Sequence, residues 1–498
     1  MSGRTQCRLC RRRLRTVNPP LSITGRRSRP RFAQKALRVR DNGVTEAPFI
    51  PVKEGTSSGH RTTSFPRLQI RTGDDRIVAH VGARVLGDLA DRTGLTADRA
   101  AALSALTQRG DDRGHVLMQV AVAIADGATT LSDIAVLRHQ PALFGAVAST
   151  PTVWRTLEAL TAEPLARVAA ARAAARRRVW AAGLDPQFYV LDIDGTWVTA
   201  HSDKEGAAPT YKRGYGFYPL VATLDATGEP LAVLLRPGNA GSGTAVDHIA
   251  VLDAALAQLP VDPHAQEVIV RTDSAGCSHK FLEYCVPTGA RFIVGHALTE
   301  DLAAAVIGRR LRWIPAVTAD GTAERDVGEV AEVTPYVDLS GWPPGSRLLV
   351  RREVPHPGAQ LTFTDLHGYR YQLCLTNLPD PDIAFLEALY RGRGRCEQVI
   401  RDLKATGLAH LPSADFATNQ AWLTAVCLAG DLLAWFRGLC LTGRWRQATP
   451  ARLRYTLFHT AGRLIRSGRR VVVRLAARWP WAAVLMAAVT RCQHLAVP

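Results

Sequence analysis

The chain has 498 residues, of which 47% are apolar and 21% charged, a composition typical of a globular protein with two to four structural units. Its net charge of +18 is carried by the two ends: residues 1–40 hold thirteen Lys or Arg, residues 436–498 hold twelve Arg, and neither contains an acid. Residues 41–435 are left with −7. Basic ends favour a polyanionic partner such as DNA or RNA, although a solvated tail would look the same.

Cysteine usage and hydropathy exclude secreted and membrane classes. The nine cysteines are an odd number without a disulfide framework, and the pair Cys7 and Cys10 has no second pair at zinc-site spacing. No run reaches the roughly 18 to 20 uninterrupted apolar residues of a membrane span, since the best, Val471 to Val489, contains Arg474 and Arg478. The N-terminus lacks the apolar run of a secretion signal. We therefore expect a cytoplasmic protein with no membrane partner.

The N-terminal third predicts a tail and a helical domain. Residues 1–62 are rich in Arg, Pro, Ser and Gly without periodicity, which indicates a disordered basic tail; a start codon assigned too early would give the same pattern. Residues 63–184 show helical periodicity and end in the basic run Arg172, Arg176, Arg177 and Arg178. A small helical domain with a basic exit helix is a common way to hold duplex DNA. We predict such a domain, with a merely supporting helical cap as the alternative.

From Gln187 the period changes to that of strands. The expected order is β-β-β-α-β-α-β, which predicts a mixed sheet with helices on its faces. Strands are expected at 188–196, 218–224, 231–235, 267–272 and 291–295, and helices at 244–259 and 280–288. Residues 185–295 would form the first part of this core.

The rest of the chain is expected to complete the core. Residues 296–378 carry repeated strand signals and predict a β-rich insertion. Residues 379–440 would supply the second part of the core, with a strong helix from Ile383 to Lys404, and residues 441–498 a basic C-terminal helical region. The fold class expected is therefore α/β: a mixed-sheet core with a β-rich insertion, an N-terminal helical domain and C-terminal helices.

Four acids stand out in these elements. Asp192 and Asp194 lie two apart on a strand and so share a face. Asp273 follows an apolar strand, and in open α/β sheets the carboxyl ends of strands are where ligands bind. Carboxylates there suit Mg²⁺, while a turn former, or for Asp273 a helix cap, is the plain alternative. Glu397 shares one helical stripe with Tyr390, Arg393 and Lys404, which a surface ion-pair ladder would also produce.

This stripe carries a family resemblance. Tyr390, Arg393, Glu397 and Lys404 satisfy the spacing Tyr-x2-Arg-x3-Glu-x6-Lys in full. By this signature the sequence resembles the DDE transposases of bacterial insertion sequences, specifically the group-1 DDE domain. The other segments that look like this group are Leu86 to Phe144, Leu191 to Thr196, His201 to Phe217 and Arg271 to Gly276. The resemblance covers roughly residues 65 to 490.

The resemblance implies an RNase H-like core, and the 123 residues between Asp273 and Glu397 fit the β-strand insertion of that family. It implies that Asp194, Asp273 and Glu397 are the catalytic acids and hold two Mg²⁺ ions, with Mn²⁺ as a substitute, and it leaves Asp192 as a neighbouring acid that could assist the metal. Arg393 and Lys404 look like phosphate contacts and Tyr390 like a stacking or backbone contact. Lys212 and Arg213, in a polar loop, are either DNA contacts or solvated.

The expected function is Mg²⁺-dependent DNA cleavage and strand transfer by two-metal chemistry, without a covalent protein–DNA intermediate. By resemblance, the partners are the terminal inverted repeats of the element and target DNA, bound by a homodimer on paired ends. A transposase-derived protein that binds DNA without catalysis and an RNase H-like nuclease remain alternatives. A non-enzymatic basic scaffold is the plainest option.

Overall fold

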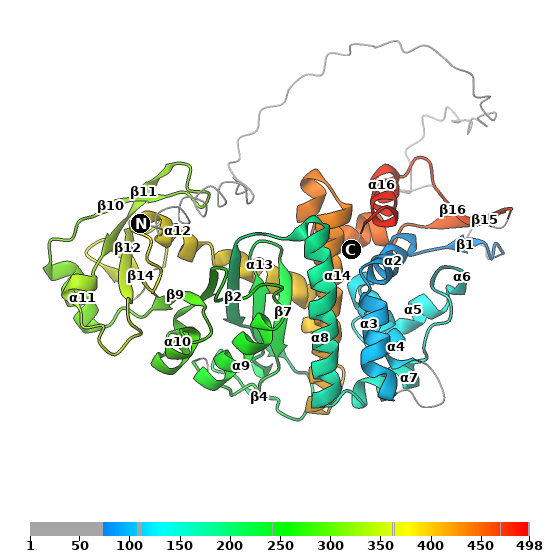
Figure 1. Ribbon diagram of the computed structural model, residues 1–498, viewed down its shortest axis with the longest axis horizontal. Helices are drawn as coiled ribbons and strands as arrows, with labels where there is room; N and C mark the ends of the chain where they lie inside the picture. The colour runs from blue at the N-terminus through cyan, green and yellow to red at the C-terminus, as the bar shows by residue number, and fades with distance from the viewer. Residues whose placement is uncertain are drawn as a thin grey trace, which may run out of the picture. The chain divides into compact units, whose positions relative to one another are not determined.

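A ten-stranded mixed sheet dominates the computed structural model, which describes residues 73–496 other than 107–111, 242, 361, 363 and 469 (Figure 1). The tail expected at 1–62 lies outside the described residues. Five strands form the core of the sheet in the order β7-β6-β2-β8-β9, and this is the RNase H-like arrangement that was expected. β2 pairs antiparallel with β6 and parallel with β8. These strands are β2 (Tyr189–Gly195), β6 (Leu220–Leu224), β7 (Glu229–Leu234), β8 (Val268–Thr272) and β9 (Arg291–His296).

The insertion continues the same sheet. Its last strand pairs antiparallel with β9, with Leu375 opposite Val294, so the sheet runs on without a break. The strand-rich block between 296 and 378 is therefore present, but the boundary expected at 296 is no boundary of the sheet. The elements are α11 (Glu300–Gly308), β10 (Ile314–Val317), β11 (Glu324–Glu332), η6 (Thr334–Tyr336), β12 (Arg347–Glu353), β13 (Asp365–Leu366) and β14 (Tyr369–Thr376).

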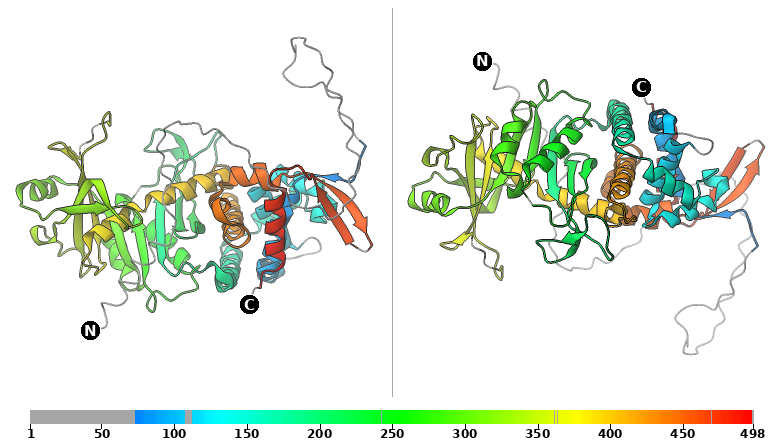
Figure 2. Two further views of the ribbon diagram at one scale, coloured as in Figure 1. Left: turned by 90° about the horizontal axis from the view of Figure 1, so that it is seen from above. Right: turned by 90° about the horizontal axis from the view of Figure 1, so that it is seen from below.

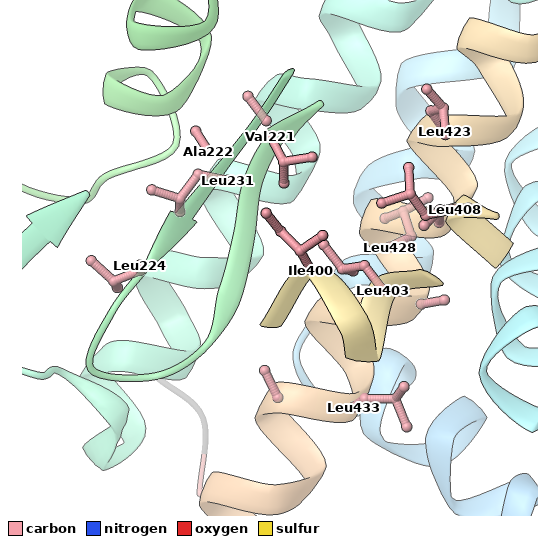
Figure 3. Close-up of a cluster of buried hydrophobic side chains, with 14 of the residues drawn as sticks. Val221, Ala222, Leu224, Leu231, Ile400, Leu403, Leu408, Leu423, Leu428 and Leu433 are labelled. Atoms are coloured by element: carbon pink, nitrogen blue, oxygen red, sulfur yellow. The ribbon is translucent and has the colours of Figure 1, made fainter. Parts of the chain in front are cut away.

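Helices pack on the sheet because its strands are apolar on both faces. Val190 of β2 clusters with Leu386 and Leu389, whereas its neighbours Leu191 and Ile193 point to the opposite face and belong to the larger core. The helices α9 (Ala245–Leu256) and α13 (Gly394–Leu403) both contact β2 and β6, while α10 (His279–Cys285) contacts β9 and α12 (Ile383–Arg391) contacts β9 to β12. Figure 3 shows Ile400 and Leu403 of α13 between the strands and α14 (Phe416–Trp435).

The helix expected from Ile383 to Lys404 is broken, so this prediction was wrong in one respect. α12 ends at Arg391 and α13 begins at Gly394. Between the two helices the backbone hydrogen bonds join residues three positions apart. The amide of Arg393 donates to the main-chain oxygen of Tyr390, and the amide of Cys396 donates to that of Arg393. Gly392 and Gly394 flank the break, and glycine is a poor helix former. Arg393 is thus the N-cap of a new helix.

The N-terminal helices are present as expected, and α14 contacts α2, α4, α7 and α8. Thr130 and Asp133 form a capping box at the start of the helical segment Leu131–Ile134. The elements are β1 (Ile77–Val78), η1 (Val81–Ala83), α2 (Arg84–Arg92), α3 (Leu95–Leu103), η2 (Ser104–Leu106), α4 (Arg113–Asp126), η3 (Leu131–Ile134), α5 (Ala135–Arg138), α6 (Pro141–Phe144), α7 (Thr150–Glu158), α8 (Ala162–Val179) and η4 (Trp180–Leu184).

The basic end of α8 does not face a polyanion, which corrects the expectation of a basic exit helix. Arg172 and Arg176 are buried and paired with Asp431 of α14 at 2.9 and 2.6 Å. Arg176 also pairs with the buried Glu229 of β7 at 2.9 Å. Arg178 binds Asp98 of α3. These arginines hold helices and sheet together, and only Arg177 of the run is exposed.

One described helix, Phe416–Cys440, is long and apolar enough to cross a membrane, with a mean hydropathy of 1.4. Asp431 lies inside it, so it contains no uninterrupted apolar run of spanning length. Its most apolar stretch is 78% buried inside the structure, as in the core helix of a globular protein. The bent pair Arg113–Asp126 and Leu131–Arg138 passes the same test only when taken as one span.

The C-terminal region is not wholly helical, contrary to expectation. A hairpin of β15 (Gly462–Ser467) and β16 (Arg470–Leu475) interrupts the helices, and β15 pairs with β1 from the other end of the described chain. Figure 2 shows this hairpin extending beyond the helices in both views. The neighbouring elements are η7 (Lys404–Leu408), η8 (Phe436–Cys440), η9 (Gly443–Gln447), α15 (Pro450–Leu453), η10 (Arg454–Phe458) and α16 (Ala482–Gln493).

Candidate active site

Two of the three acids leave neighbouring parallel strands at the same edge of the sheet. Ile193 of β2 is in register with Thr272 of β8, so Asp194 and Asp273 are the next residues on strands that lie about 4.8 Å apart. Asp273 also caps η5 (Ser274–Gly276), because its Oδ1 accepts a hydrogen bond from the amide of Ala275 at 3.0 Å. The sequence left helix cap and metal ligand as alternatives for Asp273. The cap hydrogen bond engages one of its two carboxylate oxygens.

Asp194 lies in a partly buried, charged environment. Burial raises its pKa above the ordinary value, and the negative charge of Asp273 acts in the same direction. The guanidinium of Arg393, which donates to Oδ2 of Asp194 at 2.9 Å, opposes this rise. Asp194 and Asp273 are thus two neighbouring carboxylates with one cation, Arg393, beside them. A further positive charge would stabilise their ionised forms.

Glu397 approaches these acids through Arg393. Nη2 of Arg393 lies 3.7 Å from Oε1 of Glu397, one turn along α13. The buried side chains of Cys396, Ile400 and Leu403 fix how α13 is rotated on the sheet, and Glu397 lies at the edge of that buried face with 69% of its side chain exposed. Arg393 therefore contacts two of the three acids.

The three carboxylates are not packed at the spacing of ligands to a single ion. Over the described part of the chain, the three-ligand group whose ligand atoms all lie within 4.8 Å of one another is His80, Asp126 and His459. Carboxylate oxygens are nevertheless the ligands that Mg²⁺ prefers, and it needs only one or two of them. The donor set of the acids fits a hard divalent ion, and Glu397 is exposed enough to move toward one.

Asp192 is committed to a buried ion pair. Arg271 of β8 donates to both its oxygens at 2.6 and 2.7 Å, and the side chains are 0% and 1% exposed. Burial raises the pKa of Asp192 to about 6 in spite of this partner. Arg271 also contacts Asp225 at 3.1 Å and donates to the main-chain oxygen of Leu389, at the end of α12, at 2.5 Å. This network lies on the same face as Asp194 and connects the sheet to α12.

Tyr390 packs against the strand ends. A Cβ added to Gly295 of β9 would lie 2.3 Å from Oη of Tyr390 and 2.9 Å from the amide nitrogen of Ser274. The tyrosine hydroxyl therefore sits over Gly295, beside the backbone that carries Asp273. Burial raises the pKa of Tyr390 to about 12, so the hydroxyl stays protonated. Tyr390 is largely packed inside rather than presented for stacking.

Lys404 and Lys212 lie close enough to repel each other. Burial, and then the charge of Lys212, lower the pKa of Lys404. Lys212 in turn lies 5.6 and 5.7 Å from the ring centroids of Tyr211 and Tyr218. Two cations this close to each other would suit a phosphate group between them.

The sequence reasoning missed the two tyrosines. Their hydroxyls are 2.6 Å apart, and the pKa of Tyr218 is raised, chiefly by burial and by Tyr211, with Asp194 and Asp273 adding to the rise. A Cβ on Gly195 would lie 2.5 Å from the Tyr218 ring, so this ring covers the residue after Asp194. Gly195 directly after the acid was the available signal for such a close approach.

The polar loop after β2 is partly a structural clamp. The ammonium of Lys204 donates to the main-chain oxygen of Leu411, and Glu205 accepts from the amide of Phe416 at 2.8 Å. Arg213 is exposed, with φ at +61°. The short strands of this loop are β3 (Val198–Thr199), β4 (Ala208–Pro209) and β5 (Tyr215–Phe217). The clamp holds the loop that carries Lys212 against the start of α14.

One family model matches most of the chain. Residues 61–497 match the family model described as transposase DDE domain group 1. No curated protein matches the chain. Among solved structures, the chain is similar to the piggyBac transposase in a cryo-EM synaptic complex with hairpin DNA, with 9% identity and a TM-score of 0.37, covering 76% of this chain and 77% of that one.

Proposed function

We propose, from the premise that this chain belongs to the group-1 transposase DDE domain family, that Asp194, Asp273 and Glu397 are the acids with which it cleaves DNA and transfers the strand. The observation that carries the proposal is the register of Ile193 with Thr272, which delivers Asp194 and Asp273 to one edge of the sheet. Arg393 then connects Asp194 to Glu397 across 2.9 and 3.7 Å.

The ions proposed for these acids are two Mg²⁺, with Mn²⁺ as a substitute. Such ions supply an activated oxygen nucleophile and stabilise the leaving oxygen of an in-line displacement. Asp194 must be ionised to bind them, and Arg393 favours that form by opposing the effect of burial. Asp192 is a supporting residue in this proposal, because Arg271 occupies both its oxygens.

The remaining residues of the signature would act on the DNA and on the shape of the site. Lys404 and Lys212 would bind a phosphate group, whose charge removes their mutual repulsion. Arg393 would turn to the DNA backbone once cations replace it at Asp194. Tyr390 would act on the position of Asp273 rather than on a base, and the exposed Arg213 remains a proposed DNA contact.

The finer biological assignments are also proposals. We assign the chain to a bacterial insertion sequence, acting in the cytoplasm without a membrane partner. Its DNA partners would be the terminal inverted repeats of its element and target DNA, bound as a homodimer on paired ends. The support for these assignments is the family membership together with the two basic ends of the sequence.

The test separates chemistry from binding. Wild type, Asp194→Ala, Asp273→Ala and Glu397→Gln are incubated with DNA carrying the terminal repeats, with Mg²⁺ or with EDTA. We expect cleavage at the repeat ends and strand transfer only for wild type with Mg²⁺. Glu283→Gln, an exposed glutamate on α10, is the matched control for Glu397→Gln and should retain both activities.

The other functions give different results in the same experiment. Binding of the repeats without cleavage by wild type would favour a transposase-derived binding protein. Cleavage without repeat preference or strand transfer would favour a nuclease. Full activity of Glu397→Gln would remove the third acid from the proposal.

A further inference from the structure

A second group of metal-binding side chains joins three separate parts of the helical region. His80 precedes η1, Asp126 is the last residue of α4, and His459 follows η10. Nδ1 of His80 lies 2.6 Å from Oδ2 of Asp126, and Nε2 of His459 lies 3.3 Å from Oδ1. The two imidazole rings are 4.4 Å apart. All three ligand atoms lie within 4.8 Å of one another.

The carboxylate in the middle of this group is buried, and it lies between the two imidazoles. Only 5% of the Asp126 side chain is exposed, and its Oδ1 accepts no hydrogen bond. Nε2 of His459 faces the main-chain oxygen of Asp126 instead, at 2.9 Å. Nε2 of His459, 3.3 Å from Oδ1, makes a long contact, and a cation held between this oxygen and the two imidazoles would stabilise the buried carboxylate.

The backbone at His80 supports the same interpretation. His80 has φ +57° and ψ +30°, the left-handed conformation that non-glycine residues seldom adopt. Such strain persists where the surroundings hold it, and it commonly serves to orient a side chain. Here it directs the imidazole toward Asp126. Arg454, the nearby cation, is engaged elsewhere, since it donates to the main-chain oxygens of Ile124 and Ala125 at 3.1 and 2.9 Å.

We propose that His80, Asp126 and His459 bind one zinc-like divalent ion, at a site separate from the catalytic acids. Two imidazole nitrogens and one carboxylate suit Zn²⁺, whereas Mg²⁺ prefers oxygen ligands. Bonds of about 2.0–2.1 Å place tetrahedral ligand atoms ~3.3 Å apart. The contact of His459 with Asp126 already has that length, and the contact of His80 must open slightly. Binding requires both imidazoles to be deprotonated at the nitrogen that faces the ion.

The ion would connect the N-terminal part of the described chain, through His80, and its C-terminal region, through His459, to α4. His80 follows β1, which pairs with β15, and His459 directly precedes that hairpin strand. With 42% of its side chain exposed, His459 offers a path of entry from solvent. The expected effect is stabilisation by Zn²⁺ and not by Mg²⁺, because an ion that binds only the folded state shifts the equilibrium toward it.

The experiment measures the ion directly. Chelator-treated full-length protein is mixed with Zn²⁺ or Mg²⁺, passed over a desalting column and analysed for bound metal and for its thermal unfolding midpoint. We expect one more equivalent of zinc in wild type than in His459→Gln, and a Zn²⁺-dependent rise of the midpoint in wild type alone. The exposed His139→Gln is the matched control, and Glu397→Gln should bind zinc like wild type even if it is catalytically dead.

Zinc that other residues bind is present in wild type and variants alike, so it cancels in the comparison between them. Equal zinc content in wild type and His459→Gln would overturn the proposal, as would a midpoint of wild type that Zn²⁺ does not move. Asp126→Asn tests the same site but removes a buried charge, so the wild-type titration decides the outcome if this variant fails to fold.

An independent observation concerns the hairpin of β15 and β16. Arg463 of β15 lies directly opposite Arg474 of β16, and Arg466 and Arg470 lie near the turn. All four are exposed, as are Val471 and Val472. Residues 436–498 contain no acid. Like charges opposite each other repel, so the hairpin concentrates positive charge on its surface.

We infer that this hairpin is an arm that binds duplex DNA, an inference that rests on the proposed function. A two-stranded ribbon fits the major groove, which is about 12 Å wide. Each strand has six residues, so the ribbon is about 20 Å long. On one face the register places Arg463, Arg470 and Arg474 together, and phosphates on both sides of the groove would remove their repulsion. Figure 2 shows the hairpin standing clear of the helices.

Salt-dependent binding tests the arm without using catalysis. The variant Arg463→Ala/Arg470→Ala/Arg474→Ala and a control, Arg138→Ala/Arg291→Ala/Arg310→Ala at exposed arginines elsewhere in the chain, are titrated with a fluorescent duplex over a KCl series. The slope of log K against log salt should fall by ~0.9 for each phosphate that the variant no longer binds, up to ~3 in the hairpin variant. An equal slope in the hairpin variant and the control would refute the arm. Because binding is read in the Glu397→Gln background, failure of the arm and failure of the catalytic proposal are distinguishable.

Discussion

The guanidinium of Arg393 donates a hydrogen bond to the carboxylate of Asp194 over 2.9 Å, and so ties the first residue of the α13 region to the end of β2. Both side chains are mostly buried, at 20% and 16% exposed. A divalent ion at Asp194 therefore has to replace a partly desolvated arginine. In the proposed mechanism the arginine favours the ionised acid before the ion binds, and it would turn to a DNA phosphate when it leaves.

Replacing Arg393 should make cleavage more sensitive to acid. Burial raises the pKa of Asp194 and Arg393 opposes the rise; without Arg393 the pKa rises further, and the ionised form that binds metal is lost at higher pH. We expect the acid limb of the pH–rate profile of Arg393→Gln to move to higher pH. The rate at neutral pH should also fall by about 10–100-fold, the loss of a charge-assisted hydrogen bond of ~1.5–3 kcal/mol.

The matched control for this prediction is Arg395→Gln, two residues along the same helix. Arg395 pairs with Asp225 at 2.7 Å and not with Asp194. Its profile should keep the wild-type acid limb. If Arg393→Gln and wild type lose activity at the same pH, Arg393 does not set the ionisation of Asp194.

Removing one of the two neighbouring lysines should have opposite effects on DNA binding and on stability. Lys404→Ala deletes a phosphate contact, so DNA affinity should fall and the salt slope should decrease by ~0.9. The free protein should unfold at the same temperature or slightly higher, because the repulsion between Lys404 and Lys212 is gone. Lys280→Ala, at an exposed lysine of α10, should change neither quantity. A lower unfolding temperature with unchanged DNA affinity would mean that Lys404 is only a packing residue.

Local signals were enough to predict the core of the fold. Phe188 to Gly195 and Val268 to Thr272 are apolar runs that end in acids, and parallel strands bring such ends to one edge. The placement of Asp194 beside Asp273 follows from that alone. The spacing of Arg393 and Glu397 by four residues likewise predicts their contact on a helix, and the structure has it at 3.7 Å.

What sequence patterns did not predict depends on contacts between distant residues. Arg172 and Arg176 look like a basic surface until Asp431 and Glu229, more than 50 positions away, are placed beside them. The hairpin at Gly462–Leu475 is rich in arginine and has no clean alternation, so local patterns do not distinguish it from a helix. In the structure β1 pairs with β15 as a third strand, a partner that no local window contains.

Arg271 is expected to be a major stabilising residue beneath the site. Arg271→Gln leaves Asp192 buried without its counter-charge, and breaking a buried pair in this way costs about 3–5 kcal/mol. Arg395→Ala removes a partly exposed partner of Asp225 and should cost less than about 1 kcal/mol. Urea unfolding of both variants gives the comparison. Similar free energies of unfolding for both would show that Arg271 is not the centre of the network.

The close packing of Gly295 and Tyr390 gives a prediction with its own rescue. In Gly295→Ala the new methyl group would lie 2.3 Å from the tyrosine hydroxyl and 2.9 Å from the amide nitrogen of Ser274. Overpacking of this kind costs about 1–3 kcal/mol, and here it also displaces the turn that carries Asp273. We expect slower cleavage together with lower stability. Gly308→Ala, where nothing lies within 4 Å of the new atom, should leave both unchanged.

Adding Tyr390→Phe to Gly295→Ala removes the hydroxyl that meets the methyl group but not the amide of Ser274. The double variant should therefore recover part of the cleavage rate, while Tyr390→Phe alone should be close to wild type, since that hydroxyl packs over Gly295 and stays protonated. Recovery would place Tyr390 as a positioning residue for Asp273. A strong loss in Tyr390→Phe by itself, with no recovery in the double variant, would instead mean that the hydroxyl acts on the DNA.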